Sequence, residues 1–346
     1  MLNFQEFQEY VEMNLKEVLS EEYQDAVVSL NEVTKNNGTV LHAVTVRPED
    51  SNIAPNIYLD GYFKKYEEGA DIDIVMGEIG RVAMDSMRAP EEFASIGRDF
   101  QNFDFVKDKI IMVAVNAERN RDLLAGAPHQ CREDLALIYK VMIGDNKDGI
   151  ATITIKNEHM AMWGVTTETI HDLAMENTKE ILPVTIQSMN EVMREMFAKD
   201  GMPDEIAEAM FADMPANQQM YVISNASKVN GAASMFYEDA LSGLADRIGT
   251  DLFILPSSVH ECIAVSTDMG TPESLAEMVQ EVNGTQVNLE EQLSDHVYRF
   301  DAKAKTISLA DTTMEQLEAK VSENTQEYDA SQSQSQTEGA RPRHRR

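Results

Sequence analysis

Cysteines and long apolar runs are scarce in this sequence, and both shortages limit what the chain can be. The two cysteines, Cys131 and Cys262, stand far apart and form no CxxC pair, so a disulfide framework is not indicated. No stretch approaches the roughly 18 consecutive apolar residues of a membrane span. The segment from Met1 to Leu19 carries acids at helical spacing, which a signal peptide does not. We therefore expect a cytoplasmic protein with reduced thiols and no membrane contact.

Basic residues are also few. Lysine and arginine together number 29 against 60 aspartates and glutamates, which gives a formal net charge of −31. A field of this sign repels nucleic acid and anionic membrane surfaces, so we expect no direct nucleic-acid binding. The charge is explained either by solvated helix faces or by a surface that attracts a basic protein partner or imitates the phosphates of DNA.

The sequence contains none of the short motifs that identify common enzyme classes. It has no GxxxxGK[ST] phosphate loop, no GxGxxG after a strand, no GxSxG and no HExxH. Two HxC pairs occur, His129 with Cys131 and His260 with Cys262, but no second ligand spacing accompanies them. We predict no metal site and no cofactor.

Hydrophobic periodicity predicts hairpins that are separated by helices. The Asn-Gly pair in KNNG supports the first hairpin, at 25–46. Helices are predicted at 3–19, as a pair broken near Gly69 over 60–87, and at 166–182, 190–201, 203–214 and 238–249. Strands and further hairpins are predicted at 107–116, 135–155, 183–189, 218–224, 232–237, 251–255, 259–266 and 296–310. The alternation favours an α+β fold whose antiparallel or mixed sheets are built from hairpins, with flanking helices.

Changes in composition divide the chain into three parts. Residues 1–90 are predicted to form an N-terminal subdomain with a helix, a hairpin and a helix pair, and 88–104 contain the best boundary. A central and C-terminal α+β domain is predicted over 91–322, ending in a helix at 315–322. The Ser/Gln-rich residues 323–346 offer too little apolar surface to fold, so they are predicted to be a disordered tail. This tail ends in the basic stretch RPRHRR.

The segment LFILPSSVHECIAVS, residues 252–266, concentrates more reactive side chains than any other stretch. Ser257, Ser258, His260 and Glu261 are the candidate binding residues, and they would serve an enzyme if they lined a pocket. The alternative is a turn between two strands, in which Cys262 is a small buried hydrophobic residue. Glu261 has aliphatic neighbours in the alternating pattern, which a simple turn does not explain. The sequence assigns no catalytic residue.

Several segments in order also resemble a family. They are NIAPNIYLD, APHQCREDLALIYKV, QQMYVISNASKVNGAASMFY with LFILPSSVHECIAV, and LEEQLSDHVYRFD. Over nearly all of its length except the tail, the chain is similar to an uncharacterised family of unknown function from anaerobic gut bacteria. The resemblance implies an association with mobile elements, and it brings no activity, cofactor or catalytic residue.

Two functions from different classes are compatible with these observations. The first is a cytoplasmic acidic interaction or adaptor protein without catalytic activity, whose partner is a basic protein. The second is an enzyme of unassigned class with a site around the turn from Pro256 to Glu261. The sequence does not determine the oligomeric state.

Overall fold

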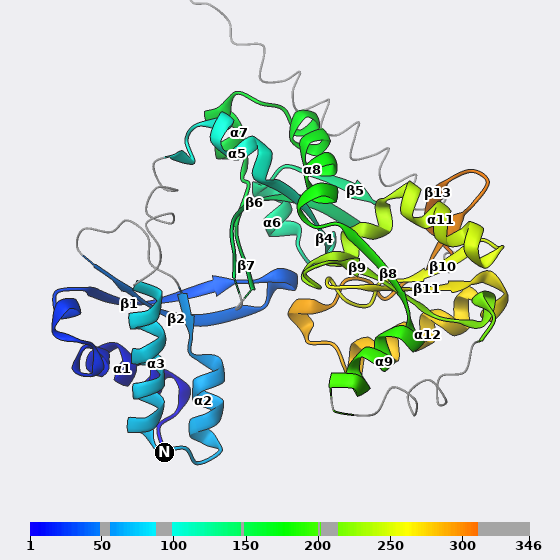
Figure 1. The fold of residues 1–346 in the computed structure, drawn as a ribbon. Helices are drawn as coiled ribbons and strands as arrows, with labels where there is room; N and C mark the ends of the chain where they lie inside the picture. Colours follow the sequence, from blue (N-terminus) through cyan, green and yellow to red (C-terminus); the bar gives the residue numbers. More distant parts are fainter. Residues whose placement is uncertain (49–55, 88–98, 147–148, 200, 202–213, 311–346) are drawn as a thin grey trace, which may run out of the picture.

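The computed structural model describes residues 1–48, 56–87, 99–146, 149–199, 201 and 214–310 (Figure 1). Within these residues the strands form three sheets, and every pair of neighbouring strands is antiparallel. Helices pack against the sheets, so the expected α+β fold with antiparallel hairpins and flanking helices is confirmed. No helix in the described ranges is long and apolar enough to cross a membrane.

The N-terminal lobe, which we define as residues 1–48 and 56–87, has a hydrophobic core of its own. Phe7, Val11 and Ile79 are fully buried in this core, where the helices meet the sheet. The predicted hairpin is present, and Asn37 occupies the left-handed region of its turn at φ 58°. The elements of the lobe are α1 (Phe4–Asn14), β1 (Val27–Thr34), β2 (Val40–Arg47), β3 (Asn56–Tyr58), α2 (Asp60–Glu67) and α3 (Ile72–Met87).

A four-stranded central sheet follows, with the long strand β6 paired to its three other strands. Strand β4 is buried along its whole length because both faces of the sheet are covered. Met112 packs with Ala174 of α8 in the main core, and Val113 packs with Leu124 of α6 on the opposite face. The elements are α5 (Phe103–Val106), β4 (Ile110–Asn116), α6 (Arg121–Gly126), β5 (His129–Arg132), β6 (Leu135–Asn146), β7 (Gly149–Thr154), α7 (Asn157–Trp163) and α8 (Thr167–Ile181).

The third sheet has six strands in the order β13-β12-β10-β11-β9-β8. One of its faces shares the main core with the central sheet, where Ile254 and Tyr298 are fully buried. Its other face packs on α12 through Phe253 and Val279. The elements are β8 (Val184–Ser188), α9 (Met189–Lys199), β9 (Tyr221–Asn225), α11 (Glu238–Ile248), β10 (Leu252–Leu255), β11 (Cys262–Ser266), α12 (Pro272–Thr285), β12 (Tyr298–Asp301) and β13 (Thr306–Leu309).

Two strand predictions are wrong. Residues 232–237 were expected to be a strand, but Gly231–Phe236 form a short 3-10 helix, and Val259 to Glu261 belong to the connection before β11. The reason is the same for both errors. The amides of Gly231 and Ala232 donate to the carbonyl oxygens of His260 and Val259, so these two segments satisfy each other's backbone outside the sheet.

Several predictions lie outside the described residues. They are the helix at 203–214, except for Met214, the helix at 315–322 and the tail at 323–346. The domain boundary that we expect near residue 90 lies in 88–98, and these residues are outside the described ranges. The division of the chain into two domains at this point therefore stays a prediction.

The tip of the β1–β2 hairpin reaches from the N-terminal lobe to a distant part of the chain, residues 288–295, which we name the docking segment (Figure 1). The Asn37 side-chain amide donates to the carbonyl oxygens of Leu289 and Gln292, both at 2.7 Å. Its side-chain oxygen accepts from Asn120 Nδ2 at 2.9 Å. The Asn37 side chain therefore connects the hairpin tip both to the docking segment and to Asn120.

Replacing Asn37 tests this connection. In Asn37→Gly the left-handed backbone is retained, because glycine adopts it freely, while three side-chain hydrogen bonds are lost. We expect the free energy of unfolding in urea to fall by about 2 to 4 kcal/mol, and amide hydrogen exchange to accelerate in the hairpin tip and the docking segment.

Lys305→Gly is the matched control for Asn37→Gly. Lys305 also has a positive φ, 55°, and its side chain makes no hydrogen bond within the described ranges, so this change measures only the effect of glycine on the backbone. Equal losses of stability in the two variants would contradict the role given to the Asn37 side chain.

Candidate functional site

The segment from Pro256 to Glu261 connects β10 to β11 and is held by its backbone on two sides. On one side, Val259 N donates to Glu291 O at 2.8 Å, and the Ser257 carbonyl accepts from Leu293 N at 3.0 Å. On the other side, the His260 carbonyl accepts from Gly231 N at 3.0 Å. The segment is therefore fixed between the docking segment and the 3-10 helix.

The side chains of this connection are largely engaged in local contacts. Ser258 is buried, and its Oγ accepts from the His260 amide at 3.0 Å. The Nδ1 atom of His260 accepts from the Asn230 amide at 3.2 Å, while its Nε2 lies 3.5 Å from Glu291 Oε1. Ser257 contributes its carbonyl oxygen to Leu293. These contacts stabilise a turn, and neither of the two hollows described below includes the four candidate residues.

Glu261 and Cys262 follow this turn and differ in their surroundings. Burial raises the pKa of Glu261, the neighbouring His260 opposes the rise and the charge of Glu291 adds to it. Burial also raises the pKa of the Cys262 thiol, which is 1% exposed and contacts Ala232 O and Met235 Sδ. Cys262 is thus the small buried hydrophobic residue that was expected, and its thiol is not activated as a nucleophile. Among the described residues no group of three metal-ligating side chains is present.

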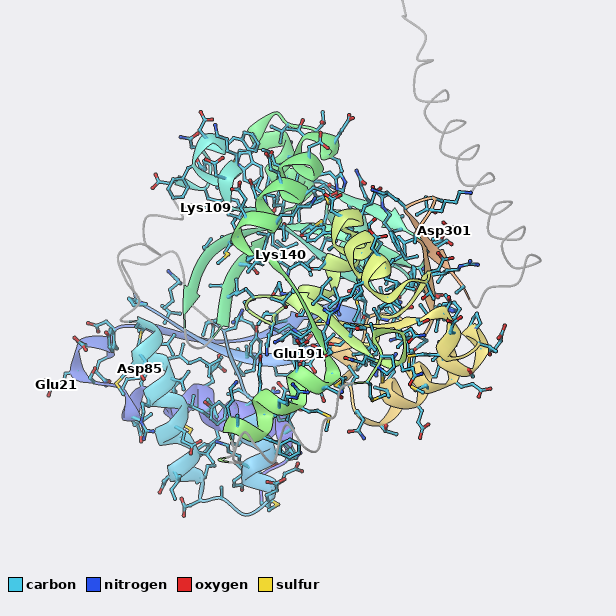
Figure 2. The ribbon with its side chains drawn as sticks, turned by 45° about the vertical axis from the view of Figure 1, so that its right-hand side comes forward. Glu21, Asp85, Lys109, Lys140, Glu191 and Asp301 are labelled. Atoms are coloured by element: carbon cyan, nitrogen blue, oxygen red, sulfur yellow. The ribbon has the colours of Figure 1, made fainter. Side chains whose placement is uncertain are left out.

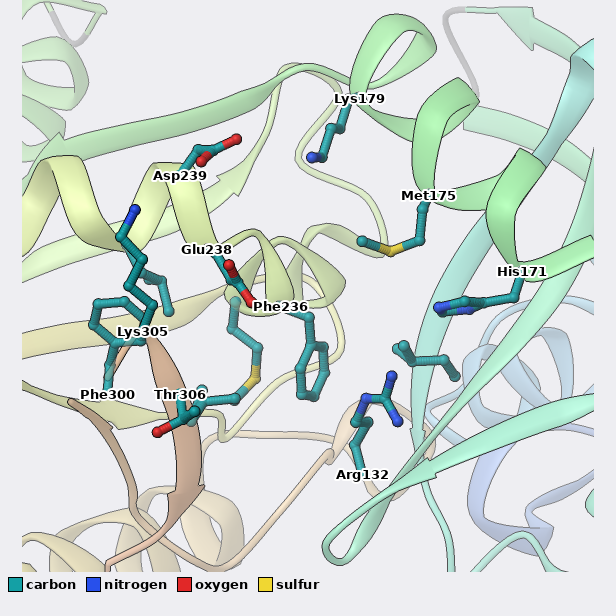
Figure 3. A pocket seen from close by; sticks show the side chains of 14 residues that line it. Arg132, His171, Met175, Lys179, Phe236, Glu238, Asp239, Phe300, Lys305 and Thr306 are labelled. Carbon is teal, nitrogen blue, oxygen red and sulfur yellow. The ribbon is translucent and has the colours of Figure 1, made fainter. Parts of the chain in front are cut away.

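The sequence did not predict a cleft of about 420 Å³ between α8, α11 and the β12–β13 hairpin (Figure 3). Its floor is apolar and includes two aromatic rings. Three basic residues and one histidine reach it from different elements: Arg132 ends β5, His171 and Lys179 lie on α8, and Lys305 lies in the β12–β13 turn. The apolar lining residues are Leu137, Met175, Met235, Phe236, Leu241, Phe300 and Ile307.

The basic groups of the cleft are not paired with a carboxylate in the described part of the chain. Within the described residues Arg132, Lys179 and Lys305 form no ion pair. The Arg132 guanidinium instead donates to Cys131 O and Gln130 Oε1, which are both neutral. Lys179 Nζ lies over the ring of Tyr237, 5.2 Å from its centroid. Glu238 and Asp239 also line the cleft, so the three cations share it with two carboxylates to which they are not paired within the described residues.

His171 is the neutral member of the cleft. Burial and the charge of Arg132 lower its pKa, while Asp172 acts in the opposite direction. Its Nδ1 lies 3.0 Å from the hydroxyl of Tyr139, whose pKa burial raises. With the protonated Tyr139 hydroxyl as donor to Nδ1, the ring proton is placed on Nε2, which makes this atom a hydrogen-bond donor.

A second hollow of about 450 Å³ adjoins the cleft and has the opposite charge. Met175 and Lys179 line both, and Asp172, Glu176 and Glu180 complete the second. These three carboxylates recur every four residues on α8, so they lie on one face of the helix. All three are exposed, and none forms an ion pair within the part of the chain that is described. We call them the α8 acidic row.

The fold and these two hollows define an α+β protein in which a hollow lined by carboxylates adjoins a cleft lined by basic residues. The chain belongs to a family of unknown function (DUF5688), whose model matches residues 4–302. No curated protein and no solved structure matches the chain.

Gly231 tests how tightly the Pro256 to Glu261 connection is packed. A methyl group there would stand 2.6 Å from Asn225 N, 2.7 Å from His260 O and still closer to Ser224 Oγ. We expect Gly231→Ala to lower the free energy of unfolding by about 3 kcal/mol, because backbone atoms must move. The control is Gly243→Ala at an exposed position of α11, where no atom lies within 4 Å and a gain of about 0.5 to 1 kcal/mol is expected. A Gly231→Ala protein as stable as the wild type would contradict this packing.

Glu261→Gln tests the partly buried carboxylate. A raised pKa in the folded state means that ionisation destabilises the fold as the pH rises through that pKa. The urea midpoint of Glu261→Gln should therefore exceed that of the wild type at pH 7, and the difference should shrink near pH 4, where Glu261 is protonated. Glu277→Gln on the exposed face of α12 controls for the loss of one negative charge. An equal gain at both positions would attribute the effect to net charge alone.

Proposed function

We propose that the protein is a non-catalytic interaction protein of the cytoplasm and that it binds a basic segment of a protein partner in the hollow along the α8 acidic row. The observation that carries this proposal is the arrangement of Asp172, Glu176 and Glu180 around one concave surface without cations paired to them within the described residues. Unpaired carboxylates that converge on a hollow are complementary to a cationic side chain.

The chemistry of the hollow fits lysine or arginine in particular. Successive carboxylates of the row are separated by about 6 Å along the helix axis, since each residue rises about 1.5 Å. Met175 lies between them as an apolar surface. A lysine or arginine side chain can lay its aliphatic stem on Met175 and place its charged end near Glu176. The ammonium of Lys179 lies over the Tyr237 ring, so it does not pair with the carboxylates of the α8 acidic row.

The charge of the whole chain supports the same type of partner. The net charge of −31 attracts cations over long distances and repels other anions. Exposed carboxylates occur far from the α8 acidic row as well, including Glu21 and Asp85 on the N-terminal lobe (Figure 2). The general field would speed the approach of a basic partner, and the hollow would fix its position.

An enzyme of unassigned class with a site around Pro256 to Glu261 is the second candidate. The observation that favours it is the raised pKa of Glu261 next to His260 and Glu291. The local contacts of Ser258 and His260 favour the interaction protein instead. An origin in anaerobic gut bacteria and an association with mobile elements are proposals that rest on the family resemblance.

Binding of a fluorescein-labelled short oligolysine peptide, measured by fluorescence anisotropy, tests the proposed function. We expect the peptide to bind the wild type, and the triple variant Asp172→Asn/Glu176→Gln/Glu180→Gln to bind about tenfold more weakly, since each exposed ion pair contributes about 0.5 kcal/mol. Affinity should also fall between about 50 and about 300 mM salt, because screening weakens exposed pairs.

The matched control is Glu273→Gln/Glu277→Gln/Glu281→Gln on α12, which removes three exposed carboxylates at the same spacing. If both triple variants lose the same affinity, the peptide responds to net charge and the α8 acidic row is not the site. The protein's own arginines at 341, 343, 345 and 346 are potential competitors, so the titration is repeated with all four replaced by glutamine.

A further inference from the structure

The basic cleft is the strongest feature of the molecule that binding of a basic partner does not use. Arg132, Lys179 and Lys305 converge there in a protein that has 60 acidic and 29 basic residues. None of the three forms an ion pair within the described residues, although Glu238 and Asp239 line the same cleft. Three basic side chains around one hollow are complementary to a negative group.

We propose that this cleft binds a small organic anion with a flat apolar body, whose negative group lies between Arg132 and Lys179 and whose body packs against Phe236. Figure 3 shows the geometry that points to this arrangement: Arg132 and His171 stand on one side of the cleft, Lys179 and Met175 lie above, and Phe236 occupies the middle. The site shares Met175 and Lys179 with the second hollow, but it uses none of the carboxylates of the α8 acidic row and does not depend on a basic partner.

The negative group would find donors of three kinds. Arg132 offers its guanidinium, which already contacts only neutral oxygens of Cys131 and Gln130. Lys179 offers an ammonium that lies 5.2 Å from the centroid of the Tyr237 ring and is not paired with a carboxylate within the described residues. His171 offers Nε2, because Tyr139 occupies Nδ1. A neutral imidazole donor beside a fixed guanidinium and an ammonium is suited to a carboxylate or a phosphate.

The body of the ligand is constrained by the lining and by the volume. Seven of the fourteen lining residues are apolar, and Phe236 and Phe300 present aromatic rings. A hollow of about 420 Å³ is within the range of about 300 to 1,000 Å³ that is usual for small-molecule sites. A ligand with one or two aromatic rings fits this space, and its flat faces can stack on phenylalanine.

Glu238 and Asp239 determine which anions are accepted. Both stand in the first turn of α11, where negative charge is favoured by the helix dipole, and in Figure 3 they lie on the side of the cleft opposite to His171. They would repel a second negative group at that end of the ligand. The cleft is therefore expected to prefer a ligand that is anionic at one end only.

Fluorescence of 8-anilinonaphthalene-1-sulfonate, an aromatic anion, tests the proposal with the full chain. The wild type should enhance the fluorescence with a saturable curve, and Arg132→Gln/Lys179→Gln should weaken the apparent Kd by about tenfold or more, as expected for two charge-assisted contacts. Both residues are exposed, so the variant should keep the wild-type circular dichroism and melting temperature.

The control is Arg121→Gln/Lys303→Gln, which removes the same two residue types from exposed positions that do not line the cleft. Both double variants change the net charge equally, so only a local site distinguishes them. Equal affinities of the two variants for the probe would overturn the proposal, and so would an absence of saturable binding to the wild type.

Competition against the bound probe identifies the chemistry of the negative group. Phenylacetate and phenyl phosphate serve as the carboxylate and phosphate arms, and benzyl alcohol serves as the uncharged arm. Displacement by either anion and not by benzyl alcohol supports the proposal. The anion that displaces the probe at the lower concentration shows whether the cleft prefers a carboxylate or a phosphate. Displacement by benzyl alcohol at the same concentrations would show that the cleft recognises only apolar surface.

Discussion

Hydrogen bonds between asparagine side chains and the docking segment hold the other parts of this structure in register. Asn37 reaches the segment from the N-terminal lobe, and Asn116 Nδ2 reaches it from the end of β4 by donating to Leu293 O at 3.0 Å. Asn120 joins these two, since its Nδ2 donates to both the Asn37 side chain and the Asn116 carbonyl. Amide side chains suit this task because each can donate and accept at once, and buried groups that satisfy one another specify a single arrangement.

The docking segment also positions the connection that carries the reactive side chains. Its backbone forms hydrogen bonds with the backbone of Ser257 and Val259. The asparagine contacts therefore also help to fix the connection before β11. Ser294 Oγ donates to Asp134 Oδ2 at 2.6 Å, and the hydroxyl of Tyr298 also contacts Asp134. Asp134 lies close to Arg132 in the turn after β5, so the same network helps to position the basic cleft. Binding surfaces on separate elements can be precise when such a shared frame fixes them.

Local signals in the sequence were sufficient for most elements of the fold. KNNG predicted the first hairpin because Asn-Gly favours positive φ, and Gly249 ended α11 in the left-handed conformation, with φ 86°. Helix α12 was missed although Thr271 and Pro272 provide a start signal, with a capping box between Thr271 and Ser274.

The strand predicted at 232–237 failed for a reason that no local signal contains. Its aromatic residues Phe236 and Tyr237 fit a strand, but two amides at the start of the 3-10 helix donate to carbonyl oxygens near residue 260, which local β propensity does not reveal.

The candidate sites also depend on contacts between segments that are distant in the sequence, which local patterns do not reveal. The stretch from Ser257 to Glu261 is a candidate site in the sequence because its reactive residues are adjacent, but a turn between two strands has the same pattern. The basic cleft joins Arg132, Lys179 and Lys305, which lie far apart in the sequence and come from three elements. Charge spacing gave no signal either: Glu176 precedes Lys179 by three residues, a spacing typical of a helical ion pair, yet the two form none within the described residues. Only the fold shows that Lys179 lines two neighbouring hollows, one of which also contains the carboxylates of the α8 acidic row.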